Sequence, residues 1–267
     1  MPLMTGPDPE ISPLEEQEFI RGKLFDGNKS TLRRYADLVV GVDASYRDLL
    51  IHEVITTLFG RLPGALGFGL RRIFYPRLFR HCGRGVIFGC DLVIRNGRSI
   101  SIGDQTILDD GCVIDGRGAG DEGVVIGARV ILSRDVMVQA KIGPVHIGDD
   151  SDIGSSSIVH SQGGTYIGKE VVIGGGAKIS GGVFQIDADD TPQDADGDQA
   201  QRAQARFTRG PIRIHDRCLF GMGCIVLDGA EIGEAAVIGA GSVVNRSIPP
   251  YSVAAGNPAR VLRTRRM

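Results

Sequence analysis

A six-residue repeat runs through the last two thirds of the chain and limits the folds that it can adopt. Each unit has an aliphatic residue, usually Gly or Asp next, two loosely constrained positions, a small residue and one more position. A fixed short period is typical of a solenoid, because one unit cannot bury its own apolar side and must stack on its neighbours. The aliphatic positions are Ile102, Leu108, Ile114, Ile126, Leu132, Val138, Ile147, Ile153, Val159, Ile167, Ile173, Ile179, Ile214, Phe220, Val226, Ile232, Ile238 and Val244.

Six residues provide one short strand and a bend, and Gly or Asp suits a bend that needs positive φ or a local side-chain bond. Equivalent positions such as Ile214 and Ile232 are three units apart, which predicts a coil with three flat faces. Coils would rise by roughly 4.8 Å, with backbone hydrogen bonds along the axis. A β-sandwich would show alternation and uneven turn spacing instead. The small inward position carries Thr106, Cys112, Val130, Ser151, Ser157, Ala177, Cys218, Cys224, Ala230, Ala236 and Ser242.

Composition agrees with this interpretation and excludes some function classes. The turn positions explain most of the 39 glycines among 267 residues. The net charge of −2 gives no support to nucleic-acid binding by bulk charge. The five cysteines contain no CxxC pair, and Cys112, Cys218 and Cys224 in the small slot are expected to be buried reduced thiols.

The first 85 residues are expected to form a tail and a helical cap. The acidic start does not resemble a signal peptide, and no apolar run approaches the roughly 18 residues of a membrane span, so we expect a cytoplasmic protein. Helical spacing continues from residue 13 to residue 80, with a cap signal at Asn28 to Ser30. The expected division is 1–85 for the tail and cap, 86–249 for the solenoid, and 250–267 for a C-terminal tail.

One helical segment has two interpretations. Residues 62–80 interleave apolar side chains with Arg71, Arg72, Arg77 and Arg80. An apolar and basic segment can lie on an anionic membrane surface. A solenoid also needs a cap over its last rung, and this helix could supply it. Both interpretations remain open at this point.

The repeat has one large interruption, at residues 183–210. A long insertion in a regular array usually carries function, although a solvated loop with no role remains an alternative. Its acidic and basic residues are Asp187, Asp189, Asp190, Asp194, Asp196, Asp198, Arg202, Arg206 and Arg209.

The C-terminal end carries a family resemblance. The segment from Ile248 to Arg260 reads Ile-Pro-Pro-Tyr-Ser-Val-Ala-Ala-Gly-Asn-Pro-Ala-Arg. With the repeats, residues 86–263 resemble the hexapeptide-repeat acyltransferases, which include galactoside, maltose and polysaccharide O-acetyltransferases. The resemblance implies a mainly β chain folded as a left-handed parallel β-helix. It also implies a homotrimer with active sites between neighbouring chains, acetyl-CoA or another acyl-CoA as co-substrate, and no metal.

The resemblance also suggests which residues contact the donor. Gly221 and Met222 would lie near the acyl end, Ala240 and Gly241 would bond the pantetheine amides, and Asn245 would lie nearby. Two arginines match tail positions near the nucleotide phosphates, which suit guanidinium forks. These are Arg260 and Arg263, for which ordinary surface charge is the alternative.

The chain departs from the family at the catalytic base. Relatives have a His after an aromatic residue just before the large loop, where this chain has Phe184 and Gln185. Gln can hydrogen-bond a substrate but cannot take up a proton near neutral pH. Another group could act as the base, with His160, Asp187 and Asp189 as candidates. Alternatively the acceptor needs little base catalysis, or the site is inactive through drift or a deliberate change.

The expected function is acyl transfer, most simply of acetyl, to a hydroxyl or amine of a sugar or glycan precursor. One rival is an inactive trimeric binding or scaffold protein that retains the donor groove. Another is an acyltransferase that uses an acyl carrier protein as donor. A gamma-class carbonic anhydrase needs three His ligands for zinc, and His146, His160 and His215 lack the close pair which that family uses.

Overall fold

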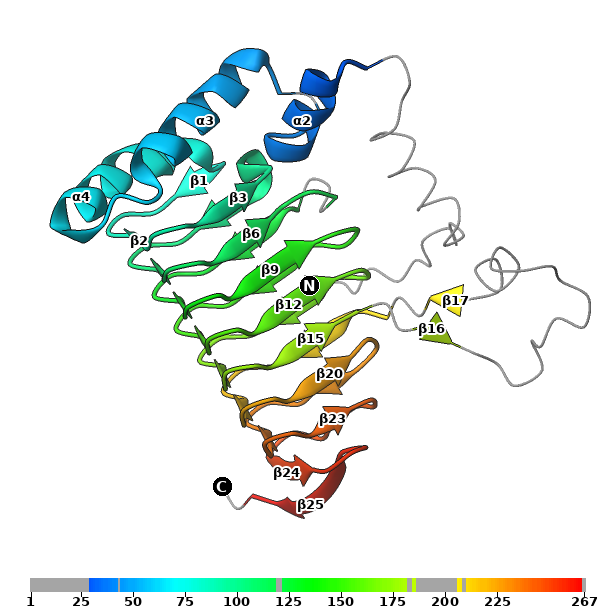
Figure 1. Ribbon diagram of the computed structural model, residues 1–267. Coiled ribbons are helices and arrows are strands. Elements are labelled where there is room, and N and C mark those ends of the chain that lie inside the picture. Colours follow the sequence, from blue (N-terminus) through cyan, green and yellow to red (C-terminus); the bar gives the residue numbers. More distant parts are fainter. Residues whose placement is uncertain are drawn as a thin grey trace, which may run out of the picture.

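The computed structural model describes residues 29–42, 44–118, 122–181 and 210–265 in full, and the backbone alone at 184–185 and 206–207. Over these residues, a small helical region stands at one end of a long three-sided β-solenoid (Figure 1). This confirms the mainly β solenoid that the repeat predicts, and the hexapeptide pattern indicates a left-handed coil. Among the described residues, no helix is long and apolar enough to cross a membrane.

Three sheets form the sides of the solenoid, and within each sheet the strands stack in parallel from one coil to the next. Sheet A contains β1 (His81–Cys82), β4 (Ile100–Ile102), β7 (Val124–Ile126), β10 (Val145–Ile147), β13 (Thr165–Ile167), β18 (Ile212–Ile214) and β21 (Glu231–Ile232). Sheet B contains β2 (Ile87–Phe88), β5 (Ile107–Leu108), β8 (Ile131–Leu132), β11 (Asp152–Ile153), β14 (Val172–Ile173), β19 (Leu219–Phe220), β22 (Val237–Ile238), β24 (Ser252–Ala255) and the antiparallel β25 (Arg260–Thr264). Sheet C contains β3 (Val93–Arg95), β6 (Val113–Asp115), β9 (Met137–Ala140), β12 (Ile158–Ser161), β15 (Lys178–Ser180), β20 (Ile225–Leu227) and β23 (Val243–Val244).

The three corners of the solenoid differ in their tolerance of extra residues. The strands at the A–B and B–C corners are joined by four residues in each coil, as at 103–106 and 109–112. The C–A corner varies from three residues at 162–164 to the long insertion at 181–211. The interruptions of the repeat therefore lie at a single edge of the prism, from which the pair β16 (Phe184–Gln185) and β17 (Arg206–Phe207) projects (Figure 1).

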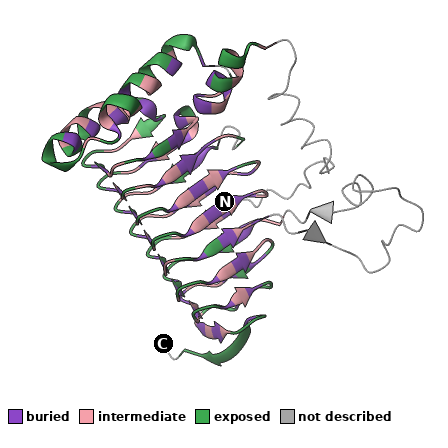
Figure 2. Ribbon diagram, in the orientation of Figure 1, coloured by how far each residue is buried: buried purple, intermediate pink, exposed green. Residues whose placement is uncertain are grey.

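The interior is built from stacked aliphatic residues and small side chains at the corners. Buried residues recur in the strands of each coil (Figure 2). All of the predicted small positions are buried. Most of those that have a hydroxyl or thiol bond a turn carbonyl one coil away, whereas Ser242 Oγ donates to Gly239 O of its own turn at 2.7 Å. Thr106 Oγ1 donates to Gly127 O at 2.7 Å, Ser151 Oγ to Gly168 O at 3.0 Å, and Cys218 Sγ to Gly233 O at 3.2 Å. These bonds satisfy polar groups that would otherwise be buried alone.

The turn chemistry differs from the expectation that the residue after the aliphatic position adopts positive φ. Gly148 has an ordinary negative φ, but a Cβ there would lie 2.5 Å from the backbone of Gly168 in the next coil. Positive φ falls two residues later, as at Asp150 (φ 59°). Asp149, between them, does not bond its own turn: Oδ1 accepts from Ala128 N of the previous coil at 2.9 Å. Close stacking of coils, rather than turn conformation, therefore selects Gly and Asp here.

The cysteines of the small slot are buried free thiols, as predicted. Burial raises the pKa of Cys112 to about 12 and the pKa of Cys218 to about 11. Burial also raises the pKa of the Cys224 thiol. Thiolates are the reactive form, so these three cysteines act as packing groups and not as nucleophiles.

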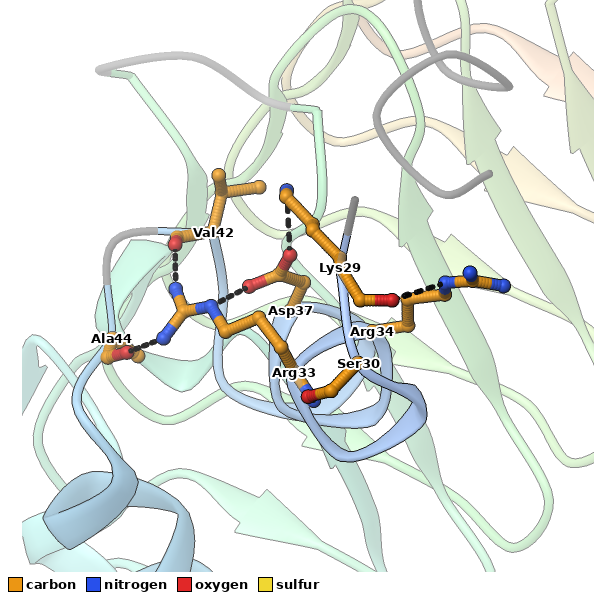
Figure 3. A network of polar contacts seen from close by, with 7 residues as sticks. All are labelled: Lys29, Ser30, Arg33, Arg34, Asp37, Val42 and Ala44. Carbon is orange, nitrogen blue, oxygen red and sulfur yellow. Dashed lines mark hydrogen bonds and ion pairs between the residues drawn. The ribbon is translucent and has the colours of Figure 1, made fainter. Parts of the chain in front are cut away.

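The described helical region begins with α2 (Thr31–Val39), whose N-cap is the predicted Ser30. A buried carboxylate holds it in place: Asp37 pairs with Lys29 at 2.9 Å and with Arg33 at 2.8 Å (Figure 3). Arg33 also donates to the carbonyls of Ala44, at 2.7 Å, and Val42. This network links α2 to the segment that leads into α3 (Tyr46–Phe59). Residues 13–28 of the predicted helical region lie outside the described residues.

The segment from Pro63 to Arg80 forms α4 (Gly64–Phe74) and a 3₁₀ turn (Tyr75–Leu78) that pack on the first coil. Phe79 stacks on Phe88 of β2, and the Tyr75 ring packs against Phe88 at a tilt of 58°. The buried Arg71 guanidinium donates to the carbonyls of Phe88, Phe59 and Leu62 at 2.9, 3.1 and 2.7 Å. The cap interpretation therefore holds for the inner side of α4. The first solenoid strand, β1, precedes Val86.

Candidate active site

Four of the predicted donor contacts lie together at the B–C corner. Gly221 and Met222 form the turn between β19 and β20, and Ala240 and Gly241 form the equivalent turn one coil later. The two turns stack directly, with Gly241 N donating to Met222 O at 2.9 Å. A Cβ on Gly221 would lie 2.5 Å from Ala240 N, so the first turn requires glycine. The Met222 side chain is 69% exposed and projects from this corner.

The C-terminal tail extends the same corner. After β24, residues 256–259 turn back so that β25 runs antiparallel beside it, with Arg260 opposite Ala255 and Arg263 opposite Val253. Ala259 N donates to Val243 O at 2.8 Å, which fixes the turn against β23. Arg260 therefore follows Gly241 down the B–C corner, and Arg263 lies farther along sheet B. Both side chains are exposed, as a guanidinium that meets phosphate oxygens must be.

Asn245 does not join this group. It follows β23, at the opposite end of the strand from Gly241, and therefore lies at the C–A corner. Its register places it in the outward column that contains His160, Ser180 and Leu227. That column lies beside the corner that carries the insertions.

His160 lies where the long insertion begins. It points outward from β12, and its Nδ1 is 3.3 Å from Ser180 Oγ on the adjacent strand. Gly181 N donates to His160 O at 3.2 Å, and the chain enters the insertion immediately after. Burial, and then the positive charge of Lys141, lower the pKa of His160. The ring is therefore neutral near pH 7, and its buried Nε2 has no hydrogen-bond partner among the described residues. A neutral imidazole with an available nitrogen can accept a proton.

The other two predicted catalytic residues belong to the insertion. Gln185 lies on β16, opposite Arg206 of β17, and Phe184 lies opposite Phe207. Asp187 is outside the described residues. The structure therefore gives the backbone position of Gln185 and leaves its role, and that of Asp187, as predictions.

Two further features, one beside the insertion and one on sheet A, had no clear sequence signal. Asp228 follows β20 at the C–A corner, and its buried Oδ2 has no hydrogen-bond partner in the described part of the chain. A Cβ on Gly181 would lie 3.9 Å from its Cβ, so it adjoins the start of the insertion. In the sequence, Asp228 looks like any other turn aspartate.

Near the last coils, a hollow of about 420 Å³ is bordered by His215 and Glu231, whose Nε2 and Oε1 atoms are 2.8 Å apart.

The histidines of the zinc alternative are spread over the prism. His146 lies on β10 of sheet A, His215 follows β18, and His160 lies on sheet C. His146 meets the edge of the Tyr166 ring instead of another histidine, with centroids 5.3 Å apart. Across the residues with described side chains, no three His, Cys, Asp or Glu are placed to hold a metal ion.

Lys141→Gln is expected to raise the pKa of His160 toward about 6.5, the ordinary value for histidine, because it removes a nearby positive charge. An NMR titration of the imidazole C–H signals, assigned with His160→Asn, measures the shift, and Lys169→Gln is the control. A lowered pKa means that His160 binds protons less readily in the folded than in the unfolded chain. The free energy of unfolding should therefore be highest above about pH 6.5 and should decrease as the pH falls through the folded-state pKa of His160. An unchanged His160 midpoint in Lys141→Gln would contradict this assignment.

Comparison with known proteins finds two matches to hexapeptide-repeat models in the solenoid. Residues 211–246 match the bacterial transferase hexapeptide (six repeats), and residues 144–180 match the hexapeptide repeat of succinyl-transferase. A provisionally named acetyltransferase of Schizosaccharomyces pombe is 55% identical over 53 residues, which are 20% of this chain and 26% of that protein. Another, from Staphylococcus aureus strain COL, is 56% identical over 54 residues, which are 20% of this chain and 27% of that protein. The chain thus spans about a quarter of the length of these relatives.

Two solved structures show partial similarity to this chain. The maltose O-acetyltransferase of Clostridium difficile 630 is 21% identical, with a TM-score of 0.42 over 83% of this chain and 88% of that chain. An N-acyltransferase of Bacillus cereus, in complex with dTDP and 3-hydroxybutyryl-CoA, is 18% identical, with a TM-score of 0.48 over 70% of this chain and 84% of that chain. Residues 144–180 and 211–246 are therefore hexapeptide repeats, and both segments lie within the three-sided β-helix.

Proposed function

We propose that this protein is an acyl-CoA-dependent acyltransferase that transfers acetyl to a hydroxyl or amine of a sugar or glycan precursor. The observation that carries the proposal is the column at the B–C corner, where Gly221, Met222, Ala240, Gly241 and Arg260 follow one another down the solenoid. The acetyltransferase names of the sequence relatives support the same reaction class. The sugar acceptor rests on the resemblance of the C-terminal motif to sugar O-acetyltransferases.

The column offers a long donor molecule two kinds of contact. The stacked turns expose backbone groups beside glycines, which lets an extended amide-containing chain approach closely. Arg260 and Arg263 offer guanidinium groups to phosphates at the C-terminal end of the column. Acyl-CoA has amides in its pantetheine arm and phosphates at its nucleotide end. The amides would therefore face the stacked turns, and the phosphates would face the arginines.

His160 is the described residue that best fits a general base. It lies at the C–A corner, so in the proposed trimer it would serve a donor bound at the B–C corner of a neighbouring chain. In the proposed step, the base takes the proton of the acceptor hydroxyl or amine while the acceptor oxygen or nitrogen attacks the thioester carbonyl. The carbon–sulfur bond then breaks, and the CoA sulfur leaves and takes up a proton. A neutral imidazole suits the first role, because its lowered pKa keeps it deprotonated near pH 7. Gln185 can orient an acceptor but cannot accept this proton.

The outer surface of sheet B supports assembly into the homotrimer that the resemblance implies. Its outward positions pair in one ladder from coil to coil, and all are aliphatic except Asp152. The ladder consists of Ile87, Ile107, Ile131, Asp152, Val172, Leu219, Val237 and Val253. A large exposed apolar surface on a soluble protein indicates an interface, and we propose that another copy of the chain covers it. Partial burial already raises the pKa of the Asp152 carboxyl.

Acetyl-CoA is expected to bind with micromolar affinity at one site per chain, as measured by calorimetry. The double variant Arg260→Ala, Arg263→Ala should weaken binding at least about tenfold, because each arginine would supply charge-assisted bonds to phosphate. Arg129→Ala, an exposed arginine paired with Asp150, is the matched control and should bind like the wild type. Failure of the wild type to bind acetyl-CoA would contradict the donor assignment and favour an acyl carrier protein as donor.

His160→Asn is expected to lower the rate of thiol release from acetyl-CoA by about 10²–10⁴ with a working sugar acceptor, the usual contribution of a positioned base. Acetyl-CoA binding should be unchanged, so a calorimetric titration of the variant is the control. Full activity of His160→Asn would rule out His160 as the base. A wild type that binds acetyl-CoA without turnover, and that gains turnover in Gln185→His, would identify the scaffold alternative.

Ile131→Asp and Leu219→Asp should convert a three-chain assembly into single chains, as measured by light scattering after size exclusion. Each change places a charge in the aliphatic ladder, where a buried unpaired carboxylate is costly. Val125→Asp is the matched control, because Val125 on sheet A is 37% exposed and Ile131 is 38% exposed. Dissociation by Val125→Asp, with no effect of the other two, would place the interface on sheet A instead.

A further inference from the structure

Helix α3 carries apolar residues on two opposite sides. Leu49 and Ile55 are buried toward the rest of the protein. On the other side, Leu50, Val54 and Leu58 follow at intervals of four residues and are 63%, 45% and 59% exposed. A helix that is apolar all round is normally covered on all sides. The outer side of α3 therefore has the composition of a contact surface.

Helix α4 contributes a second exposed apolar row beside it. Phe59 at the end of α3 stacks on Phe74 at the end of α4, with ring centroids 4.6 Å apart. The inner side of α4 is occupied by Arg71 and Gly67, whereas Leu66 and Ile73 are 67% and 58% exposed. The two helices lie side by side at the end of the solenoid opposite β25, and exposed residues follow both of them (Figures 1 and 2). We name Leu50, Val54, Leu58, Leu66 and Ile73 the outer cap face.

Positive charge is concentrated around this face. Residues 46–80 contain six arginines and two acidic residues, Asp48 and Glu53, whereas the whole chain has a net charge of −2. Arg71 is the buried member of the six, and the other five are exposed: Arg47, Arg61, Arg72, Arg77 and Arg80. The end of the molecule that carries these helices is therefore basic, and the remainder of the chain is acidic.

From this combination we propose that the outer cap face docks on an anionic lipid bilayer. Leucine and isoleucine side chains enter the boundary between headgroups and acyl chains, and exposed arginines of the same helices, Arg47 on α3 and Arg72 on α4, meet lipid phosphates. Arg61 is instead paired with Asp91 of the first coil, and Arg80 donates to Arg98 O. A protein partner would need polar groups that fix its orientation, and this face consists mainly of aliphatic residues and arginines. The docked protein would stand on its cap, with the B–C corner column near Arg260 at the distant end. The inference is independent of the acyltransferase proposal.

Flotation of the full chain with vesicles tests the proposal. The protein is expected to float with phosphatidylcholine vesicles that contain about 30% phosphatidylglycerol, and to float much less with phosphatidylcholine alone. The bound fraction should fall as salt rises, because screening weakens the attraction to phosphates. Val54→Asp and Leu58→Ser should each lower the partition coefficient at least about fivefold, and Arg72→Glu by a similar factor, since a basic residue near an anionic surface contributes about 1 kcal/mol.

Two control variants carry the same chemical changes at the other end of the molecule. Leu262→Asp on β25 and Arg246→Glu after β23 alter exposed residues, and both should float like the wild type. Equal flotation with charged and neutral vesicles, or full flotation of Val54→Asp, would overturn the proposal. A change of oligomeric mass in Val54→Asp without lipid would show that a second copy covers the face. Flotation only after removal of residues 1–28 would show that the chain's own first segment covers it.

Discussion

The stacking of one coil on the next governs the rest of this structure. Backbone hydrogen bonds run between coils along all three sheets, so each corner of the prism must bring successive turns within van der Waals distance of each other. At Gly148 and Gly221 a Cβ would collide with the turn of the next coil. Aspartates such as Asp149 bond the backbone N–H of the previous coil, and Thr106 or Ser151 bond carbonyls of the next one. Since each polar group finds its partner only in the correct register, the corners hold the aliphatic core in alignment.

The same stacking explains why much of the fold could be predicted from the sequence. A strict period assigns residues as distant as Gly221 and Gly241 to equivalent turns, so that contact between the two corner turns follows from counting alone. Buried thiols at Cys112 and Cys218 follow from their place in the small slot. The return of β25 beside β24 did not follow, because the repeat ends before it. The position of Asn245 did not follow from the repeat either, because the short strand β23 lies between Gly241 and Asn245 and the two residues are therefore at different corners.

The proposed catalytic region was harder to predict, because it depends on side chains that the repeat does not constrain. His160 is an outward residue in a strand, and the sequence indicates only that it lies one coil before Ser180. Its lowered pKa depends on burial and on Lys141, which follows β9 of the same sheet. Asp228 adjoins the start of the insertion because β20, which precedes it, pairs with β15, although residues 182–209 separate the two coils in the sequence. Long insertions remove the period, and with it the basis for assigning neighbours.

The unequal corners of the prism have a consequence for how such a chain can change its length. A residue added at an A–B or B–C corner would displace every later Gly and Asp from its partner in the adjacent coil, and would also turn the aliphatic residues of the next strand outward. Turns at the C–A corner also pack closely in places, since a Cβ on Gly143 would lie 2.2 Å from Gly164 N, but the connections there already range from three residues to the whole of 181–211. Insertions and deletions can therefore accumulate along this one edge without cost to the core. New loops, and with them new specificities, would arise repeatedly beside the column that contains His160.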